Sequence, residues 1–308
     1  MPADFRPGRY GTAATTTAPR PRTTRLRARW LLAAASILAA ASASMAAEPV
    51  AYTAEYKLRA FGLRGKMNVE QHPEPGVIDA EGPVWRYRSE LRAKGLGKLF
   101  FGGTTFEDAL FEVRDGRLRP LHVTGLDTMK DRAKDVTFTW PEGDDAASEG
   151  PLAEGTDAEA TFSMEMPPEV LDRALLIPAI GLDLEHSGAA RDADGKLTLA
   201  SAPLDPDRGY RFRVLERGQL RDYYARLVGE EALDGPEGDP VETLVFEHRR
   251  DGSSRTTTFW LAPSLDYLPI QIQQRKHDKK PHLRAVLKDY QPLDPDQQQQ
   301  PNPERDAR

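Results

Sequence analysis

The sequence predicts a mainly β protein, with a single antiparallel curved sheet or open β-barrel and one short covering helix. Three observations support this fold class. Roughly a dozen short segments alternate apolar with polar residues, which is the period of a half-buried strand. A single segment has helical spacing, and no linker divides the strand patterns into two groups. The 308 residues are 39% hydrophobic, which suits a globular domain with its own core.

The N-terminal segment has the organisation of a secretory signal peptide. Five arginines between Arg20 and Arg29 precede an apolar run over 30–43, and small residues follow. This order predicts that residues 1–47 are a signal peptide, cleaved near Ala46/Ala47. The apolar run is shorter than the roughly 20 residues of a membrane-spanning helix, so we expect no transmembrane segment after cleavage. The expected location is the periplasm, because the chain also has no Cys that could be acylated.

The mature chain is acidic. Residues 1–47 hold seven arginines and one acidic residue, so the remaining 35 basic residues stand against 47 acidic ones, a net charge of −12. A protein that binds nucleic acid should have the opposite balance, so we expect no nucleic-acid partner. The absence of Cys also excludes disulfides, thiolate metal sites and cysteine nucleophiles.

Alternating strand patterns fill the first half of the mature chain. The clearest of them places Trp85, Tyr87 and Leu91 on one face and charged residues on the other. Turns with Gly separate several of these patterns. The predicted strands of this half span 50–58, 65–70, 84–91, one or two strands within 99–113, 117–126 and 133–140.

An acidic loop and the predicted helix occupy the centre of the chain. Residues 141–160 are acidic, Gly-rich and poor in large apolar side chains, which predicts a solvated loop. The motif Pro167-Pro168-Glu169 then opens a helix over about 168–177, because Pro and Glu both suit a helix start. We expect Pro178 to end or kink this helix.

Strand patterns resume after the helix. They span 196–201, 210–216, 220–229, 241–249, 255–262, 268–275 and 283–290. Residues 48–293 are therefore predicted to form a single β domain, followed by a disordered Gln/Pro-rich tail over 294–308. A split into two domains near 145–165 is the alternative, but it would leave each half with an open, edge-rich sheet.

A hairpin pattern over 255–275 is the most distinctive feature of the sequence. Its first strand ends in Trp260-Leu261-Ala262, a turn runs from Pro263 to Asp266, and Pro269 lies early in the return strand. Pro has no N–H, so Pro269 must face a sheet edge. We expect Trp260 to be buried against the sheet interior. This Trp-Leu-Ala strand followed by a Tyr-Leu-Pro-Ile return resembles a secreted bacterial family, the domain of unknown function 3108.

Other segments of the mature chain match the same family, among them the opening Tyr52-Thr53-Ala54-Glu55-Tyr56 and the strand over 242–246. The resemblance implies a periplasmic antiparallel β fold with no established activity. The hairpin is also similar, more weakly, to that of open β-barrel carriers of lipoproteins such as LolA-like proteins. Such a likeness of fold does not assign a function.

Motifs for catalysis or cofactor binding are absent from the sequence. It contains no nucleophile elbow, P-loop, Gly-x-Gly-x-x-Gly or His-Glu-x-x-His. His277 and His282 lie among lysines that would repel a cation, so they are interpreted as part of a polar hairpin loop. We predict no catalytic residue, no cofactor and no metal site. Paired catalytic carboxylates remain open, because the fold and not the sequence spacing sets their geometry.

Apolar residues interrupted by glycines form the candidate ligand site. Gly lets strands bend and approach, while large apolar side chains offer contact surface. The residues predicted to contact a ligand are Phe61, Leu63, Leu96, Phe100 and Phe101. Ordinary core packing with bends is the alternative interpretation of the same residues.

These observations favour a non-enzymatic periplasmic β protein that binds an apolar ligand or an envelope polypeptide in a concave sheet. The first alternative is a structural or adaptor protein of the cell envelope with no ligand pocket. An envelope hydrolase is the third hypothesis.

Overall fold

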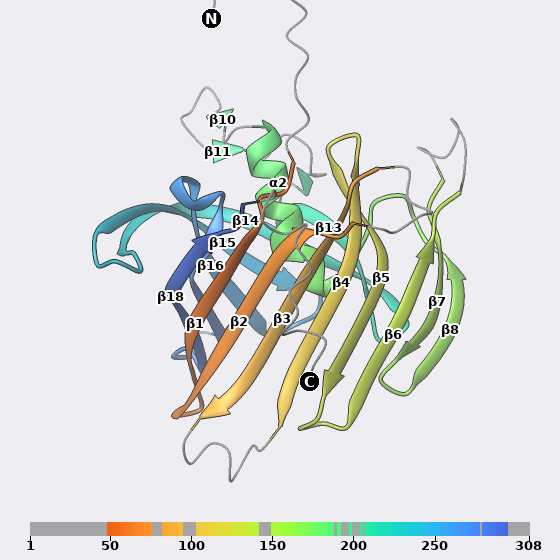
Figure 1. Cartoon of the computed structure of the whole chain (residues 1–308), viewed down its shortest axis with the longest axis horizontal. Coiled ribbons are helices and arrows are strands. Elements are labelled where there is room, and N and C mark those ends of the chain that lie inside the picture. The colour runs from red at the N-terminus through yellow and green to blue at the C-terminus, as the bar shows by residue number, and fades with distance from the viewer. Residues whose placement is uncertain are drawn as a thin grey trace, which may run out of the picture. The chain divides into compact units, whose positions relative to one another are not determined.

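The computed structural model describes residues 48–75, 82–94, 103–141, 149–187, 190–191, 197–198, 204–205, 207–277 and 279–294. Within these residues, 16 strands form one large curved, open sheet (Figure 1). The strands β10 (Ala190–Arg191) and β11 (Leu197–Thr198) form a separate two-stranded sheet. The prediction of a mainly β fold with one curved sheet is confirmed.

Antiparallel strands that follow one another along the chain make up most of the large sheet. Its first eight strands are β1 (Tyr52–Ala60), β2 (Leu63–Pro73), β3 (Val84–Lys94), β4 (Thr104–Arg114), β5 (Arg117–Asp127), β6 (Arg132–Thr139), β7 (Leu152–Asp157) and β8 (Ala160–Glu165). The other eight are β9 (Val170–Asp172), β12 (Leu204–Asp205), β13 (Gly209–Glu216), β14 (Gln219–Asp234), β15 (Pro240–Arg250), β16 (Arg255–Ala262), β17 (Leu268–Lys276) and β18 (Leu283–Pro292). The helical elements are η2 (Arg173–Leu175), α2 (Leu176–Ser187) and η3 (Pro263–Leu265).

The two halves of the chain join through the first and last strands of the sheet. β1 pairs antiparallel with β18, from Tyr52 opposite Pro292 to Ala60 opposite Leu283. β9 departs from the antiparallel pattern, because it pairs in parallel with β13. Strands on both sides of residues 145–165 therefore belong to the same sheet.

Alternation along the strands decides which side chains face the concave side. In β1, Tyr52, Ala54, Tyr56 and Leu58 are buried, and the residues between them are more exposed. Successive side chains of a strand point to opposite faces, so one face of β1 packs inward along its whole length. The period-2 patterns of the sequence therefore correspond to real strands, and β16 begins and ends where the sequence predicts.

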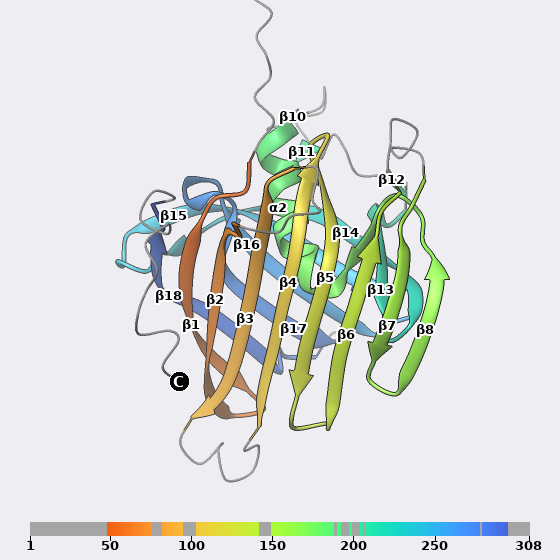
Figure 2. The ribbon, with the colours of Figure 1, turned by 45° about the vertical axis from the view of Figure 1, so that its right-hand side comes forward.

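Helix α2 lies between strands β1–β5 and strands β14–β17 (Figure 2). Its side chains Leu176, Ile180 and Leu184 are buried, together with Phe111 of β4 and Phe246 of β15. Fully burying one such side chain contributes about 1.5–3 kcal/mol to folding. The helix covers part of the concave face of the sheet. Among the described residues, we find no helix with the length and apolarity needed to cross a membrane.

The predicted position of the helix, about 168–177, is wrong in part, because the helical segment begins only at Arg173 and continues to Ser187. Residues Val170–Asp172 form β9, and Asp172 caps the 3-10 turn η2 by accepting a hydrogen bond from the N–H of Ala174 (2.9 Å). The α-helix begins only at Leu176, so Pro178 lies in its first turn, where a missing N–H costs no helical hydrogen bond. Pairing with β13 overrides the helical spacing at residues 170–172.

The predicted acidic loop over 141–160 is also wrong in part. Residues 142–148 lie outside the described residues, but β7 occupies Leu152–Asp157. Its inward position holds Ala153, which is fully buried opposite Phe138. At Gly155, with φ of 145°, an added Cβ would lie 2.0 Å from the carbonyl oxygen of Asp135. Close packing requires small residues at these positions. Because large apolar residues are missing, the sequence does not show the alternating pattern that predicts a strand.

Candidate functional site

A cavity of about 720 Å³ lies on the concave side of the sheet. Its walls come from strands β1–β4 on one side and strands β13–β17 on the other, and the start of helix α2 adds Leu176 and Ile177. This volume falls within the range of about 300–1,000 Å³ that is typical of small-molecule sites. The cavity is therefore the candidate functional site.

Apolar and aromatic side chains line one part of the cavity. The contributing strands bring Tyr56, Met67 and Val69 from β1 and β2, and Phe259 and Ile272 from β16 and β17. Their inward orientation follows from strand alternation, since Tyr56 belongs to the buried face of β1. This surface can contact an apolar ligand without leaving polar groups unpaired.

Three tyrosines add hydroxyl groups to the same wall. Burial raises the pKa of Tyr52 and Tyr56 well above 10.0, and their tyrosine neighbours add to the shift. Burial, followed by the negative charge of Glu107, also raises the pKa of Tyr87. All three rings are uncharged near neutral pH, so these tyrosines offer hydrogen-bond donors but no charge.

An ion pair connects the start of the helical segment to the sheet inside the cavity. Arg173 of η2 donates a hydrogen bond to the Glu107 carboxylate of β4. The Arg173 side chain is 50% exposed because it projects into the cavity, and the negative charge of Glu107 raises its pKa. The two charges neutralise each other within the site.

A second charged cluster lies on the opposite wall. Arg250 donates to Glu216 (Nη1 to Oε2, 2.8 Å), and the Tyr223 hydroxyl donates to the same oxygen (3.1 Å). Burial alone would raise the pKa of Glu216, but the hydrogen bond and charge of Arg250, with the charge of Arg173, lower it overall. Glu216 is therefore ionised near neutral pH and already has its partners.

His248 is buried beside this cluster. Its ring stacks on Tyr223 with centroids 4.9 Å apart and lies 5.8 Å from the ring of Phe259. Burial and the charge of Arg173 lower its pKa to about 3, and its Nε2 atom is buried without a hydrogen-bond partner. An effective acid–base catalyst needs a pKa near the working pH, so His248 is not suited to that role near neutrality.

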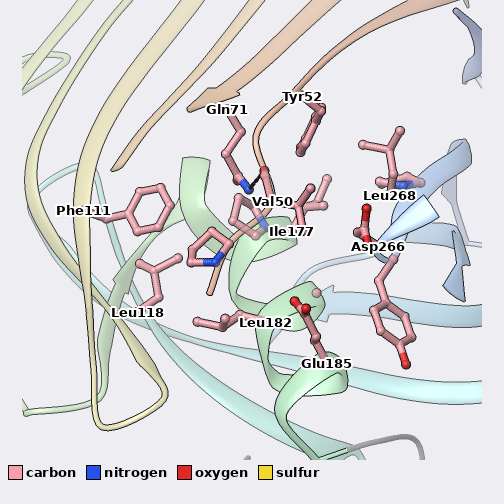
Figure 3. Close-up of a pocket in the computed structure, with 15 residues that line it drawn as sticks. Val50, Tyr52, Gln71, Phe111, Leu118, Ile177, Leu182, Glu185, Asp266 and Leu268 are labelled. Atoms are coloured by element: carbon pink, nitrogen blue, oxygen red, sulfur yellow. Dashed lines mark hydrogen bonds between the residues drawn. The ribbon is translucent and has the colours of Figure 1, made fainter. Parts of the chain in front are cut away.

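A smaller cavity of about 40 Å³ adjoins the larger one and shares Tyr52, Ile177, Leu268 and Pro269 with it. Figure 3 shows helix α2 passing between Phe111 and Leu118 on one side and Asp266 on the other. In this space Gln71 donates from Nε2 to the carbonyl oxygen of Val50 (2.9 Å), while its Oε1 has no partner. The volume suits a few water molecules and is far below that of typical small-molecule sites.

The structure places two of the five predicted ligand-contacting residues, and neither lines the cavity. Phe61 is 75% exposed at the turn between β1 and β2, and its ring lies 5.2 Å from that of His282. His282 hydrogen-bonds to Gln274, which does line the cavity, so Phe61 lies at the same end of the sheet as this residue. Leu63 is half-buried at the start of β2. Leu96, Phe100 and Phe101 lie outside the described residues, so ligand contact by these five stays a prediction.

Trp260 is buried, with 9% of its surface exposed, but not against the interior of the sheet. Thr257 and Phe259 line the cavity, so alternation places the indole on the opposite face, where its Nε1 donates to Glu231 (2.7 Å). The expectation that Trp260 packs against the sheet interior is therefore wrong: the indole is buried on the outer face of the sheet. The long strand β14 supplies Glu231, a contact that the hairpin sequence does not contain.

The two prolines of the hairpin occupy special backbone positions. Pro263 begins η3, and the turn continues through Asp266 and Tyr267, both with positive φ. Pro269 pairs with Leu261 at the register shift between β16 and β17, and β17 pairs with β18 only over residues 271–274. Pro269 has no neighbour on β18, so its missing N–H costs no hydrogen bond between β17 and β18.

Sequence reasoning missed the charged residues of the cavity. Strand alternation could have identified them, because every second residue of a strand points to the same face. Glu107 shares a face with the fully buried Ala109 and Phe111, and His248 shares a face with Phe246. A charged or polar residue at an inward position marks a site that needs a partner. The partner of Glu107 is Arg173, which lies 66 positions further along the chain in η2, so the sequence alone could not pair the two residues.

Fold and cavity together define a class: a mainly antiparallel β protein whose curved sheet encloses a hollow interior beside a covering helix. The sequence matches the family described as "Protein of unknown function (DUF3108)" over residues 51–277, and the chain belongs to that family. This confirms the resemblance inferred from the hairpin. The chain is also similar to the crystal structure of a β-barrel-like protein of domain of unknown function DUF1849 from Brucella abortus. The two share 14% sequence identity with a TM-score of 0.46, over 81% of this chain and 100% of that one. No protein with a curated description matches the sequence.

Proposed function

We propose that this protein is exported to the periplasm and binds an apolar ligand in the cavity, without catalysing a reaction on it. The observation that carries the proposal is the 720 Å³ cavity with its aromatic and aliphatic wall. A concave site of this size, with an apolar wall and a small number of convergent polar groups, is typical of small-molecule binding sites.

The chemistry of the charged lining supports binding over catalysis. Glu107 and Glu216 are both held in ion pairs, with Arg173 and Arg250. Neither carboxylate is placed to act as a free acid or base, and His248 is neutral. Among the described residues, no three potential ligands gather to hold a metal ion.

A cavity-filling variant tests this function. Ser89 lines the cavity from β3, so Ser89→Phe would occupy part of it with a ring. Titration with the neutral fluorescent probe N-phenyl-1-naphthylamine should show saturable binding to the wild type and clearly weaker binding to Ser89→Phe.

The matched control is Ser163→Phe, because Ser163 lies exposed on β8, outside the cavity lining. It should bind the probe like the wild type, and melting curves should show that both variants are folded. Absent probe binding, or equal binding to Ser89→Phe, would argue against the cavity as a ligand site and favour an adaptor without a pocket.

A further inference from the structure

The charges that line the cavity are strongly unbalanced. Six are basic and two are acidic: Arg173, Arg217, Arg249, Arg250, Arg255 and Lys276 against Glu107 and Glu216. The two acids are paired with Arg173 and Arg250. Arg217, Arg255 and Lys276 therefore have no acidic partner in the lining. Arg249 alternates with the inward His248 and Arg250, so its side chain points to the outward face of β15.

Two of these basic residues lie directly opposite each other. Arg255 at the start of β16 pairs in register with Lys276 at the end of β17. Within the part of the chain that the structure describes, neither side chain forms an ion pair. Both side chains are exposed, so solvent screens part of their repulsion. Like charges in directly opposite positions still disfavour the pairing of two strands. An anion bound between the two side chains would relieve the repulsion.

The side chains that line the cavity from β16 and β17 become less polar along the two strands. Three successive cross-strand residue pairs, or rungs, point inward and line the cavity: Arg255–Lys276, then Thr257–Gln274, then Phe259–Ile272. At about 3.3 Å per residue, the first and third rungs lie about 13 Å apart. Beyond the third rung the lining continues with Leu268 and with Leu176 of the helix. The wall is therefore charged at the strand ends, polar in the middle and apolar at depth.

We propose that the ligand is an amphiphile with an anionic head group, bound with its head between Arg255 and Lys276 and its apolar part at Phe259 and Ile272. This inference rests on the proposed ligand-binding function and adds the chemical class and the direction of the ligand. A neutral apolar molecule would use the deep end alone and would leave the basic rung unpaired. A carboxylate and a phosphate ester share the required negative charge.

Three probes with the same apolar chain test the proposal: dodecanol, dodecanoate and dodecyl phosphate. Dodecanol is titrated calorimetrically below its solubility limit, and the two anionic probes below their critical micelle concentrations. We expect at least one anionic probe to bind roughly tenfold more tightly than dodecanol, with a preference that falls as salt screens the charges. The tighter anionic probe distinguishes a carboxylate head from a phosphate head.

The double variant Arg255→Gln/Lys276→Gln should lose this preference while its affinity for dodecanol stays unchanged. Its matched control is Lys57→Gln/Arg59→Gln, which removes the same charge from the outward face of β1, where these residues alternate with the buried Tyr56 and Leu58. The control should keep the anion preference.

The outcomes separate this inference from the proposed function. If dodecanol binds and neither anionic probe binds more tightly, the anionic ligand is refuted while the apolar site stands. A preference that survives in Arg255→Gln/Lys276→Gln also refutes the assignment of the head group to this rung. If none of the three probes binds, the proposed function itself fails and the inference falls with it.

Discussion

Lys134 of β6 and Asp172 of β9 form a buried ion pair that connects distant parts of the sheet. The Asp172 side chain is 1% exposed, and its second oxygen accepts the capping hydrogen bond from Ala174. β9 pairs with β13 near one end of the strand order, whereas β6 lies near the other end. This one carboxylate therefore helps to hold both ends of the open sheet around the helix.

Lys134→Met should destabilise the protein strongly. It would leave the Asp172 carboxylate buried without its cation, and breaking a buried pair in this way typically costs about 3–5 kcal/mol. The free energy of unfolding from urea titration at neutral pH measures the effect. Lys130→Met is the control, because its pair with Asp127 is exposed at the Lys130 side chain and is worth less than about 1 kcal/mol. Equal effects of the two substitutions would contradict this account of the sheet closure.

Trp260→Ala should also destabilise the protein, by about 3–5 kcal/mol, because it removes a large buried ring. It also leaves Glu231 without the indole donor. Pro269→Ala should cost much less, since Pro acts mainly by restricting the unfolded chain. Thermal melts of the two variants compare them directly. An unchanged melting temperature for Trp260→Ala would show that the indole has no structural role.

The buried His248 predicts a pH dependence of stability. Its pKa in the folded protein, about 3, lies below the ordinary value of 6.5, so the unfolded chain binds more protons between these limits. The contribution of His248 to stability is therefore fully present above pH 6.5 and is lost as the pH falls toward 3. The slope is at most about 1.4 kcal/mol per pH unit.

Urea titrations of the wild type and of His248→Phe at pH 7 and pH 5 measure this contribution. The wild type should lose more unfolding free energy on acidification than the variant, which keeps an aromatic ring against Tyr223 and Phe259. Arg173, Glu216 and Arg250 remain in both proteins, so their titration is common to the comparison. Identical losses in both proteins would assign the pH dependence to other groups.

Export predicts a defined start of the mature chain. If residues 1–47 act as a signal peptide, the protein recovered from the periplasm should begin at Ala47 or Glu48. Intact-mass measurement and N-terminal sequencing locate this residue. An uncleaved N-terminal segment in the membrane fraction would contradict the proposed location.

Strand positions were largely predictable because each strand carries its own period-2 signal. Trp85 and Tyr87 share the buried face of β3 without help from any other segment. The helix was not predictable in the same way. Residues Val170–Asp172 have helical neighbours in sequence, but their pairing with β13, some forty residues away, makes them a strand.

The cavity was even less accessible to sequence analysis. Its walls join strands β1–β4 to strands β13–β17, and they meet because the last strand pairs with the first. The ion pair between Glu107 and Arg173 spans 66 positions of the chain. The sequence shows only that such charged residues occupy positions that alternate with the outward ones. This pattern does not identify their interaction partners.

Native mass spectrometry of the protein isolated from the periplasm, without detergent or refolding, is the most direct test of the cavity as a ligand site. We predict a bound small amphiphile on the wild type, released on unfolding, with much lower occupancy in Ser89→Phe and normal occupancy in Ser163→Phe. A wild-type protein that is entirely free of ligand, or equal occupancy in Ser89→Phe, would contradict the assignment of ligand binding to this cavity.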